Sequence, residues 1–144
     1  IGSLAFDSTA LTSFDFSDGL EKIGHYAFAD CKNLQTAMLP DSLTQLGMGS
    51  FLQCNSLETV TLGSAEKIPY ECFVACNIRF LVIPDSVTEV GDYAFDCNDL
   101  RSLTLSNNLK KIGFHAFGNT KEDCKENCHK HICFVDFQSA CKCK

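Results

Sequence analysis

A short pattern of apolar and polar positions recurs along the whole chain and ends each time in a phenylalanine. The six copies are IGSLAF (1–6), IGHYAF (23–28), LGMGSF (46–51), IPYECF (68–73), VGDYAF (90–95) and IGFHAF (112–117). Their phenylalanines follow one another at intervals of 22 or 23 residues. A period of this length predicts a repeat architecture, because one such unit cannot bury its own apolar side whereas stacked units can.

Each unit carries a second apolar pattern of the form L-x2-L-x-L. Its last two apolar positions alternate with polar or variable ones, which is the period of a strand with one buried face. The copies are Leu11/Phe14/Phe16, Leu34/Ala37/Leu39, Leu57/Val60/Leu62, Ile78/Leu81/Ile83 and Leu100/Leu103/Leu105. The segment that follows each copy is too short and broken for a long helix. We therefore expect a right-handed solenoid with parallel strands stacked along one wall, and short irregular or 3-10 turns and short strands on the other side.

The string at 83–105, IPDSVTEVGDYAFDCNDLRSLTL, resembles the leucine-rich repeat of BspA-like surface proteins. That repeat runs roughly L-x2-L-x-L-P-x2-L-x2-I-G-x2-A-F-x2-C. This chain departs from it locally, because Pro69 replaces the glycine, Ser50 and Cys72 replace the alanine, and Cys97 comes one residue early. The resemblance implies a leucine-rich repeat solenoid of the α/β horseshoe type, with its parallel sheet on the concave wall.

The composition is that of a globular chain, with 45% apolar and 21% charged residues among 144. Residues 1–118 are expected to form about six coils, and residues 119–144 a Cys-rich C-terminal cap. The formal net charge is −6, and acidic and basic residues are interspersed. Neither a basic stripe for nucleic acid nor a membrane-spanning apolar run is present in the sequence. The chain starts inside a repeat, which suggests a fragment of a longer protein.

Four of the ten cysteines follow a repeat phenylalanine by two or three residues: Cys31, Cys54, Cys76 and Cys97. Equivalent residues of adjacent coils lie about 5 Å apart. We therefore expect a buried structural ladder of thiols, with a metal or redox row as the weaker alternative. Cys72 stands at the alanine position of its motif and is expected to be a buried core residue.

The tail combines five cysteines with two histidines, and the apolar pattern returns in residues 132–137 as one further strand. The tail residues in question are Cys124, Cys128, Cys133, Cys141 and Cys143, with His129 and His131. Because a solenoid needs its open end covered, we interpret this segment as a cap. Disulfides between the Cys124/Cys128 and Cys141/Cys143 pairs would suit an extracellular protein. A zinc site from Cys124, Cys128, one histidine and a later cysteine, or free thiols, are the alternatives.

The repeats contain no Gly-rich phosphate loop, paired-carboxylate constellation or metal motif, so we expect neither an enzyme nor a cofactor. Function is then expected on the surface, where each strand turns two residues outward. These columns are Ser13, Thr36, Thr59, Phe80, Ser102 and Phe134, and Asp15, Met38, Thr61, Val82, Thr104 and Asp136. The exposed apolar residues Met38, Phe80, Val82 and Phe134 are a candidate partner footprint, together with the small polar residues Thr59, Thr61, Ser102 and Thr104. The alternative is that single surface hydrophobes are ordinary. His25 and His115 are expected to be solvated turn residues on the opposite side.

The resemblance to BspA-like proteins implies surface display and adhesion to host or matrix proteins. We therefore expect a noncatalytic module of a secreted or cell-surface protein, with a protein partner and no nucleic acid. The alternative is an intracellular scaffold with reduced cysteines and a zinc-bound cap. Catalysis would require a further domain outside this chain.

Overall fold

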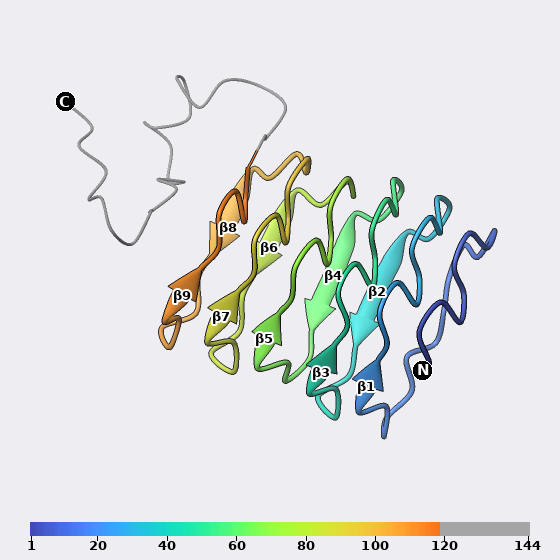
Figure 1. Ribbon diagram of the computed structural model, residues 1–144, viewed down its shortest axis with the longest axis horizontal. Coiled ribbons are helices and arrows are strands. Elements are labelled where there is room, and N and C mark those ends of the chain that lie inside the picture. The colour runs from blue at the N-terminus through green and yellow to red at the C-terminus, as the bar shows by residue number, and fades with distance from the viewer. Residues whose placement is uncertain (119–144) are drawn as a thin grey trace.

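The computed structural model describes residues 1–118 and shows a stack of similar coils (Figure 1). Within these residues there are nine short strands: β1 (Lys22–Ile23), β2 (Thr36–Leu39), β3 (Gln45–Leu46), β4 (Thr59–Leu62), β5 (Lys67–Ile68), β6 (Phe80–Val82), β7 (Glu89–Val90), β8 (Ser102–Thr104) and β9 (Lys111–Ile112). Every pairing between them is parallel and joins equivalent strands of adjacent coils. The predicted parallel-strand solenoid is confirmed.

The strands form two walls. The even-numbered strands β2, β4, β6 and β8 make the long-strand wall, with β2 paired to β4 and β6 to β8. The odd-numbered, two-residue strands make the short-strand wall, with β1 paired to β3 and β5, β7 and β9 in one sheet. In β2 and β4 exposed and buried residues alternate, as the L-x-L pattern predicts.

A third wall, here called the turn wall, contains the phenylalanine of each motif. It comprises residues 3–8, 25–30, 48–53, 70–75, 92–97 and 114–118. Backbone N–H groups on this wall donate to carbonyls of the next coil, for example from Phe28 to Ser50 at 2.8 Å, and this ladder continues through every described coil. The turn wall consists of turns rather than strands because pairs of residues separated by four positions, such as Tyr26 and Asp30, have a left-handed backbone conformation.

Residues 1–118 contain no helix, so the α part of the predicted α/β horseshoe is not found there. Left-handed residues, with φ between 49° and 58° at the non-glycine positions, recur in each turn and are incompatible with a right-handed α-helix. The concave curvature expected for the long-strand wall stays a prediction.

The core is a column of phenylalanine rings between the walls. Phe28, Phe51, Phe73 and Phe95 have no exposed surface. Their rings stack at centroid distances of 5.1 to 5.3 Å with interplanar angles of 3° to 4°. The conserved spacing of the motif thus places one ring per coil on the next ring.

Glycines let the coils approach closely beside this column. A Cβ atom added to Gly47 would lie 2.3 Å from the backbone carbon of Gly24, and one added to Gly113 would lie 2.3 Å from the backbone nitrogen of Asp92. At Gly47 and Gly113 the I-G step of the motif therefore requires glycine for steric reasons.

Both strand walls are interrupted between the same two coils. β3 is not paired with β5, and β4 is not paired with β6. On the short-strand wall, Gly91 and Gly113 each donate a backbone hydrogen bond at 2.7 Å to the preceding coil. Pro69 takes the equivalent place and has no N–H to donate.

On the long-strand wall the coil is one residue shorter at this boundary. Two residues separate Cys54 from Leu57, whereas one separates Cys76 from Ile78. The turn-wall ladder continues across the boundary, with Gln53 N–H donating to the Val74 carbonyl at 2.8 Å. Residues 1–118 thus form two blocks, β1–β4 and β5–β9, joined through the turn wall, the phenylalanine column and a few bonds of Asn55 and Asn77, such as that from the Asn77 N–H to the Leu57 carbonyl at 3.0 Å.

Candidate binding surface

The long-strand wall exposes the residues that the alternating pattern turns outward. Phe80, Val82 and Met38 are 69%, 63% and 53% exposed. The hydroxyl-bearing residues around them are exposed as well: Thr36, Thr59, Thr61, Ser102 and Thr104. We call these eight residues the long-strand face. Phe134 and Asp136 lie outside the described residues.

Strand pairing divides this face into two groups. In one block, Met38 pairs with Thr61. In the other, Phe80 pairs with Ser102 and Val82 with Thr104. Phe80 and Val82 therefore stand together beside small hydroxyl side chains that leave them accessible, whereas Met38 lies beyond the boundary between β4 and β6.

Charged side chains border Phe80 where β6 and β8 begin. The Nη2 atom of Arg101 lies 3.2 Å from the Asp99 carboxylate, and the Nε atom of Arg79 lies 3.8 Å from it. All three side chains are partly exposed, so these ion pairs add little stability. Two guanidinium groups share one carboxylate here, at one end of the apolar pair.

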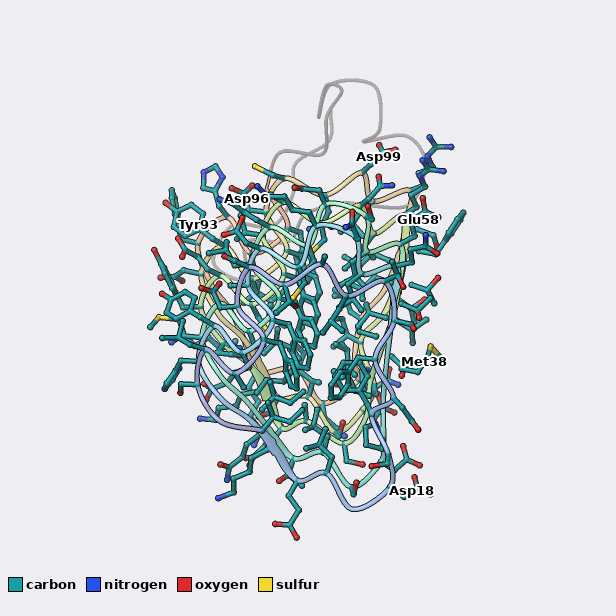
Figure 2. The ribbon with its side chains drawn as sticks, turned by 90° about the vertical axis from the view of Figure 1, so that its right-hand side faces the viewer. Asp18, Met38, Glu58, Tyr93, Asp96 and Asp99 are labelled. Atoms are coloured by element: carbon teal, nitrogen blue, oxygen red, sulfur yellow. The ribbon has the colours of Figure 1, made fainter. Side chains whose placement is uncertain are left out.

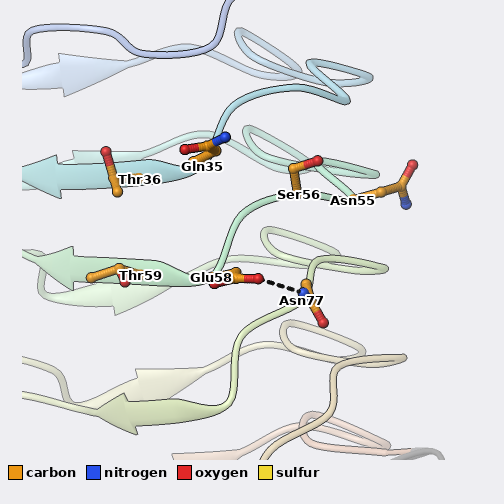
Figure 3. Close-up of a pocket in the computed structure, with 7 residues that line it drawn as sticks. All are labelled: Gln35, Thr36, Asn55, Ser56, Glu58, Thr59 and Asn77. Carbon is orange, nitrogen blue, oxygen red and sulfur yellow. Dashed lines mark hydrogen bonds between the residues drawn. The ribbon is translucent and has the colours of Figure 1, made fainter.

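An open polar recess lies at the same end of the strands, beside β2 and β4 and at the boundary between the blocks (Figure 3). It is lined by Gln35, Thr36, Asn55, Ser56, Glu58, Thr59 and Asn77. The Asn77 amide donates to Glu58 Oε1 at 3.1 Å. The lining offers amide, hydroxyl and carboxylate groups that can form hydrogen bonds, and it contains neither a histidine nor a cysteine.

The thiol ladder is present in three coils. Cys31, Cys54 and Cys76 are buried, and each thiol donates to the carbonyl of a repeat phenylalanine of the preceding coil at 3.1 to 3.3 Å. Each of these carbonyls also accepts a backbone N–H of its own turn, from Thr9, Cys31 or Cys54 at 3.3 to 3.4 Å, so the thiol is a second donor to it. Their role in the structure is that of small buried hydrogen-bonding groups.

The expectation that Cys97 continues this ladder is wrong. Cys97 is only half-buried, and the buried Asn98 takes the ladder position. The Asn98 amide donates to the Phe73 carbonyl at 2.8 Å, and its Oδ1 accepts the N–H of Ile78 at 3.0 Å. The physical reason is register, because the ladder position is always the third residue after the phenylalanine. Counting from Phe95 instead of matching cysteines would have identified Asn98.

Burial keeps the core thiols protonated. It raises the pKa of Cys54 and Cys72 to about 12, and that of Cys76 well above its usual value. A thiol is a nucleophile and a metal ligand only as thiolate. No group of three or more His, Cys, Asp or Glu in residues 1–118 is arranged to hold a metal ion.

The predicted cap lies outside the described residues. This applies to its strand at 132–137, to the proposed disulfide or zinc ligands Cys124, Cys128, Cys133, Cys141 and Cys143, and to His129 and His131. Disulfide pairing in the tail therefore stays a prediction.

The sequence matches the BspA type leucine rich repeat region in six copies over residues 1–122. The chain belongs to the BspA-type leucine-rich repeat family. No curated protein matches the sequence. In the part of this BspA-type chain that the structure describes, no helix is long and apolar enough to cross a membrane.

Two solved structures resemble the BspA-type solenoid. A leucine rich cell surface protein from Faecalibacterium prausnitzii A2-165 is 22% identical, with a TM-score of 0.52 over 68% of this chain and 33% of that protein. The pneumococcal vaccine antigen PcpA is 21% identical, with a TM-score of 0.64 over 83% of this chain and 45% of that protein. At these identities the likeness shows the fold, and the chain spans less than half of either protein.

The turn wall of this BspA-type solenoid carries residues that the sequence pattern did not single out. Tyr70 and Phe114 are 42% and 64% exposed, and Tyr93 contacts both rings. His25, which the sequence predicts as a solvated turn residue, is exposed, and its Nδ1 accepts the N–H of Met48 at 2.9 Å. The available signal was the aromatic content of the two variable positions in I-G-x-x-A-F.

Proposed function

We propose that the chain is a noncatalytic protein-binding or adhesion module of a secreted or cell-surface protein, and that it meets its partner with the long-strand face. Membership of the BspA-type family supports the class of function. One related solved structure is described as a cell surface protein and the other as a vaccine antigen, which agrees with display outside the cell.

The observation that carries the choice of face is the exposed pair Phe80 and Val82 on an otherwise hydroxyl-bearing wall. Protein interfaces bind most tightly where an aromatic anchor is buried at the centre and polar groups surround it. Arg79 and Arg101 supply such a border at one end of the pair. A partner that covers Phe80 removes apolar surface from water, which is favourable at about 25 cal/mol per Å².

The same exposed pair defines the experiment. The variant Phe80→Ser with Val82→Ser removes the anchor, and we expect binding to fall at least about tenfold, since each interface aromatic of this kind contributes about 1 to 2 kcal/mol or more. Binding of the purified chain to a panel of extracellular-matrix proteins and to host cells is the measurement. Leu4→Ser is the matched control, because Leu4 is 59% exposed on the turn wall.

The possible outcomes distinguish an incorrect binding face from an incorrect function. Unchanged binding by the double variant, with an unchanged melting temperature, would reject the long-strand face. A wild-type chain that binds no matrix protein and no cell would reject the adhesion function itself.

An intracellular scaffold is the second candidate function. Intact mass of the non-reduced protein, with a zinc assay, distinguishes the two candidates. Disulfides in the tail would favour the extracellular module, whereas ten free thiols or stoichiometric zinc would favour the scaffold.

A further inference from the structure

The turn wall displays a cluster of aromatic rings drawn from three consecutive coils. It consists of Tyr70, Tyr93, Phe114 and His115, here called the aromatic cluster. Tyr93 stands at its centre, with ring centroids 6.1 Å from Tyr70, 5.7 Å from Phe114 and 5.8 Å from His115. The Tyr93 and His115 rings are nearly parallel, at 19°, whereas Tyr70 and Phe114 stand almost perpendicular to Tyr93. Tyr70, Phe114 and His115 are exposed, and Tyr93 is half-buried between them.

The backbone beneath these rings is held by the turn-wall ladder. The backbone N–H of Glu71 donates to the Asp92 carbonyl at 3.1 Å, and the backbone N–H of Tyr93 donates to the Phe114 carbonyl at 2.9 Å. The Asp92 carboxylate also accepts the Phe114 N–H at 2.8 Å. Each coil is thus fixed to the next directly under the aromatic cluster, so binding there requires little ordering of the protein.

Charge on this wall has one sign. Across the six segments that define the turn wall there are five acidic residues, and neither lysine nor arginine occurs: Asp7, Asp30, Glu71, Asp92 and Asp96. Three of these, Glu71, Asp92 and Asp96, belong to the coils of the aromatic cluster. Figure 2 shows Tyr93 and Asp96 on the side of the molecule opposite to Met38 and Glu58, so this surface is separate from the long-strand face.

The Tyr70 hydroxyl contributes no negative charge of its own. Hydrogen bonding to Glu71 raises the pKa of the Tyr70 hydroxyl above its ordinary value, because the neutral phenol is the donor in that bond. The negative charge beside the rings comes from the carboxylates of this wall.

Exposed ring faces beside carboxylates favour cations over anions. Lysine and arginine bind ring faces within about 6 Å of the centroid, and their carbon chains pack against ring edges. The planar guanidinium of arginine also stacks on aromatic rings. Nucleic acid or an acidic protein would be repelled by the same carboxylates.

We propose that the aromatic cluster, with Glu71, Asp92 and Asp96, is a second docking surface that binds lysine and arginine side chains of a basic segment of a partner protein. The solenoid would then offer two different surfaces on opposite sides, an apolar one on the long-strand wall and a cation-binding one on the turn wall. One partner could span both, or two partners could bind at once.

The test uses a fluorescent arginine-rich peptide, titrated with the whole chain at physiological salt. Tyr70→Leu with Tyr93→Leu keeps apolar volume and every carboxylate but removes two ring faces. We expect this double variant to weaken binding at least about fivefold, as the loss of two exposed cation–π contacts implies. Glu71→Gln is expected to weaken binding about two- to fivefold, and its matched control Glu58→Gln on the opposite wall is expected to leave binding unchanged.

Four outcomes would overturn the proposal. The first is that the wild-type chain does not bind the arginine-rich peptide. The second is that the double leucine variant binds as well as the wild type, which would leave only general negative charge. The third is equal weakening by Glu58→Gln and Glu71→Gln. The fourth is cluster-dependent binding of a neutral oligosaccharide without binding of the peptide, which would assign the rings to sugar recognition.

The double variant Phe80→Ser with Val82→Ser tests whether the aromatic cluster binds the peptide independently of the proposed adhesion face. We expect that variant to bind the arginine-rich peptide like the wild type. A melting temperature within a few degrees of wild type for each variant ensures that lost binding is not lost folding.

Discussion

A single phenylalanine in the core column contacts one ring above and one below. Phe95, for example, stacks on Phe73 at 5.1 Å and on Phe117 at 5.5 Å, with rings parallel within 6°. Removing one ring therefore opens a cavity and breaks two stacking contacts at once. Stability in this fold depends strongly on each individual ring.

We expect Phe95→Ala to lower the free energy of unfolding by about 3 to 5 kcal/mol. The reason is that Phe95 is fully buried and its neighbours belong to different coils, which cannot close the gap independently. Urea unfolding followed by circular dichroism measures the loss. Phe114→Ala is the control, since its ring is 64% exposed and its removal should change stability by about 0.5 kcal/mol or less. A stability of Phe95→Ala close to wild type would show that the column is misplaced.

Because of the buried core thiols, we expect the free energy of unfolding to fall at alkaline pH. The pKa of Cys72 rises from 9.0 to about 12 on folding. Below pH 9 the thiol is protonated in both states and its stabilisation is complete. As pH rises from 9 toward 12 the unfolded chain ionises first, so stability falls by up to about 1.4 kcal/mol per pH unit for this thiol.

The variant Cys72→Ala tests whether this thiol causes the fall in stability with rising pH. Alanine is tolerated at this position, because other coils carry it, as at Ala94. We expect the urea midpoint of the wild type to fall more steeply between pH 9 and 10.5 than that of Cys72→Ala. Parallel slopes for the two proteins would contradict the protonated, buried state of the thiol.

At the scale of the element, close approach of the coils depends on the I-G step. We expect Gly47→Ala to destabilise the chain by about 1 to 3 kcal/mol, the range for overpacked sites, because its Cβ would lie 2.3 Å from the Gly24 backbone. Gly2→Ala is the matched control, since a Cβ there has nothing within 4 Å. Thermal unfolding of both variants is the measurement, and equal melting temperatures would show that the coils can separate without cost.

The strands of the long-strand wall could be predicted from the sequence because alternation sets which side chains are buried. That alternation alone predicts that the side chains of Phe80 and Val82 face outward. The turn wall could not be predicted in the same way, since its ladder depends on left-handed backbone at residues such as Tyr26 and Glu71. These residue types give no sign of that conformation, which the stacked neighbours impose.

The sequence pattern did not predict the role of Asn98 or the aromatic cluster, and the physical reason differs between the two. Asn98 replaces a thiol because an amide can make the same bond to a phenylalanine carbonyl and also accept the Ile78 N–H that the shortened coil leaves open. The aromatic cluster was missed because its residues occupy variable positions of the motif. Hydrophobic periodicity describes what is buried and does not indicate which exposed positions come together.

At the scale of the whole molecule, residues 1–118 divide into two blocks at the boundary between β1–β4 and β5–β9. Both strand walls are interrupted between β3 and β5 and between β4 and β6. The boundary keeps the turn-wall bonds and the contact of Phe51 with Phe73, whose ring centroids lie 5.1 Å apart. In a solenoid, stability is the sum of unit and nearest-neighbour terms, so a weak interface divides the cooperative unit.

We expect native-state hydrogen exchange in low denaturant to show two sets of amides, one in β1–β4 and one in β5–β9. Mass spectrometry of peptides from each block measures this. Pro69→Gly returns a backbone donor at the boundary and should bring the two sets closer together. A single exchange transition for all protected amides of the wild type would reject the division into blocks.

The boundary has a further consequence if the chain works under load. A module that anchors a cell to a surface is pulled, and the pull passes through the stack from coil to coil. Within each block the paired strands share that tension with the turn wall, but between the blocks the strand pairing is interrupted and the turn wall carries most of it. Tension would open the stack there first, so that the tether lengthens while each half keeps its own coils and the exposed pair Phe80 and Val82 stays intact on the second half.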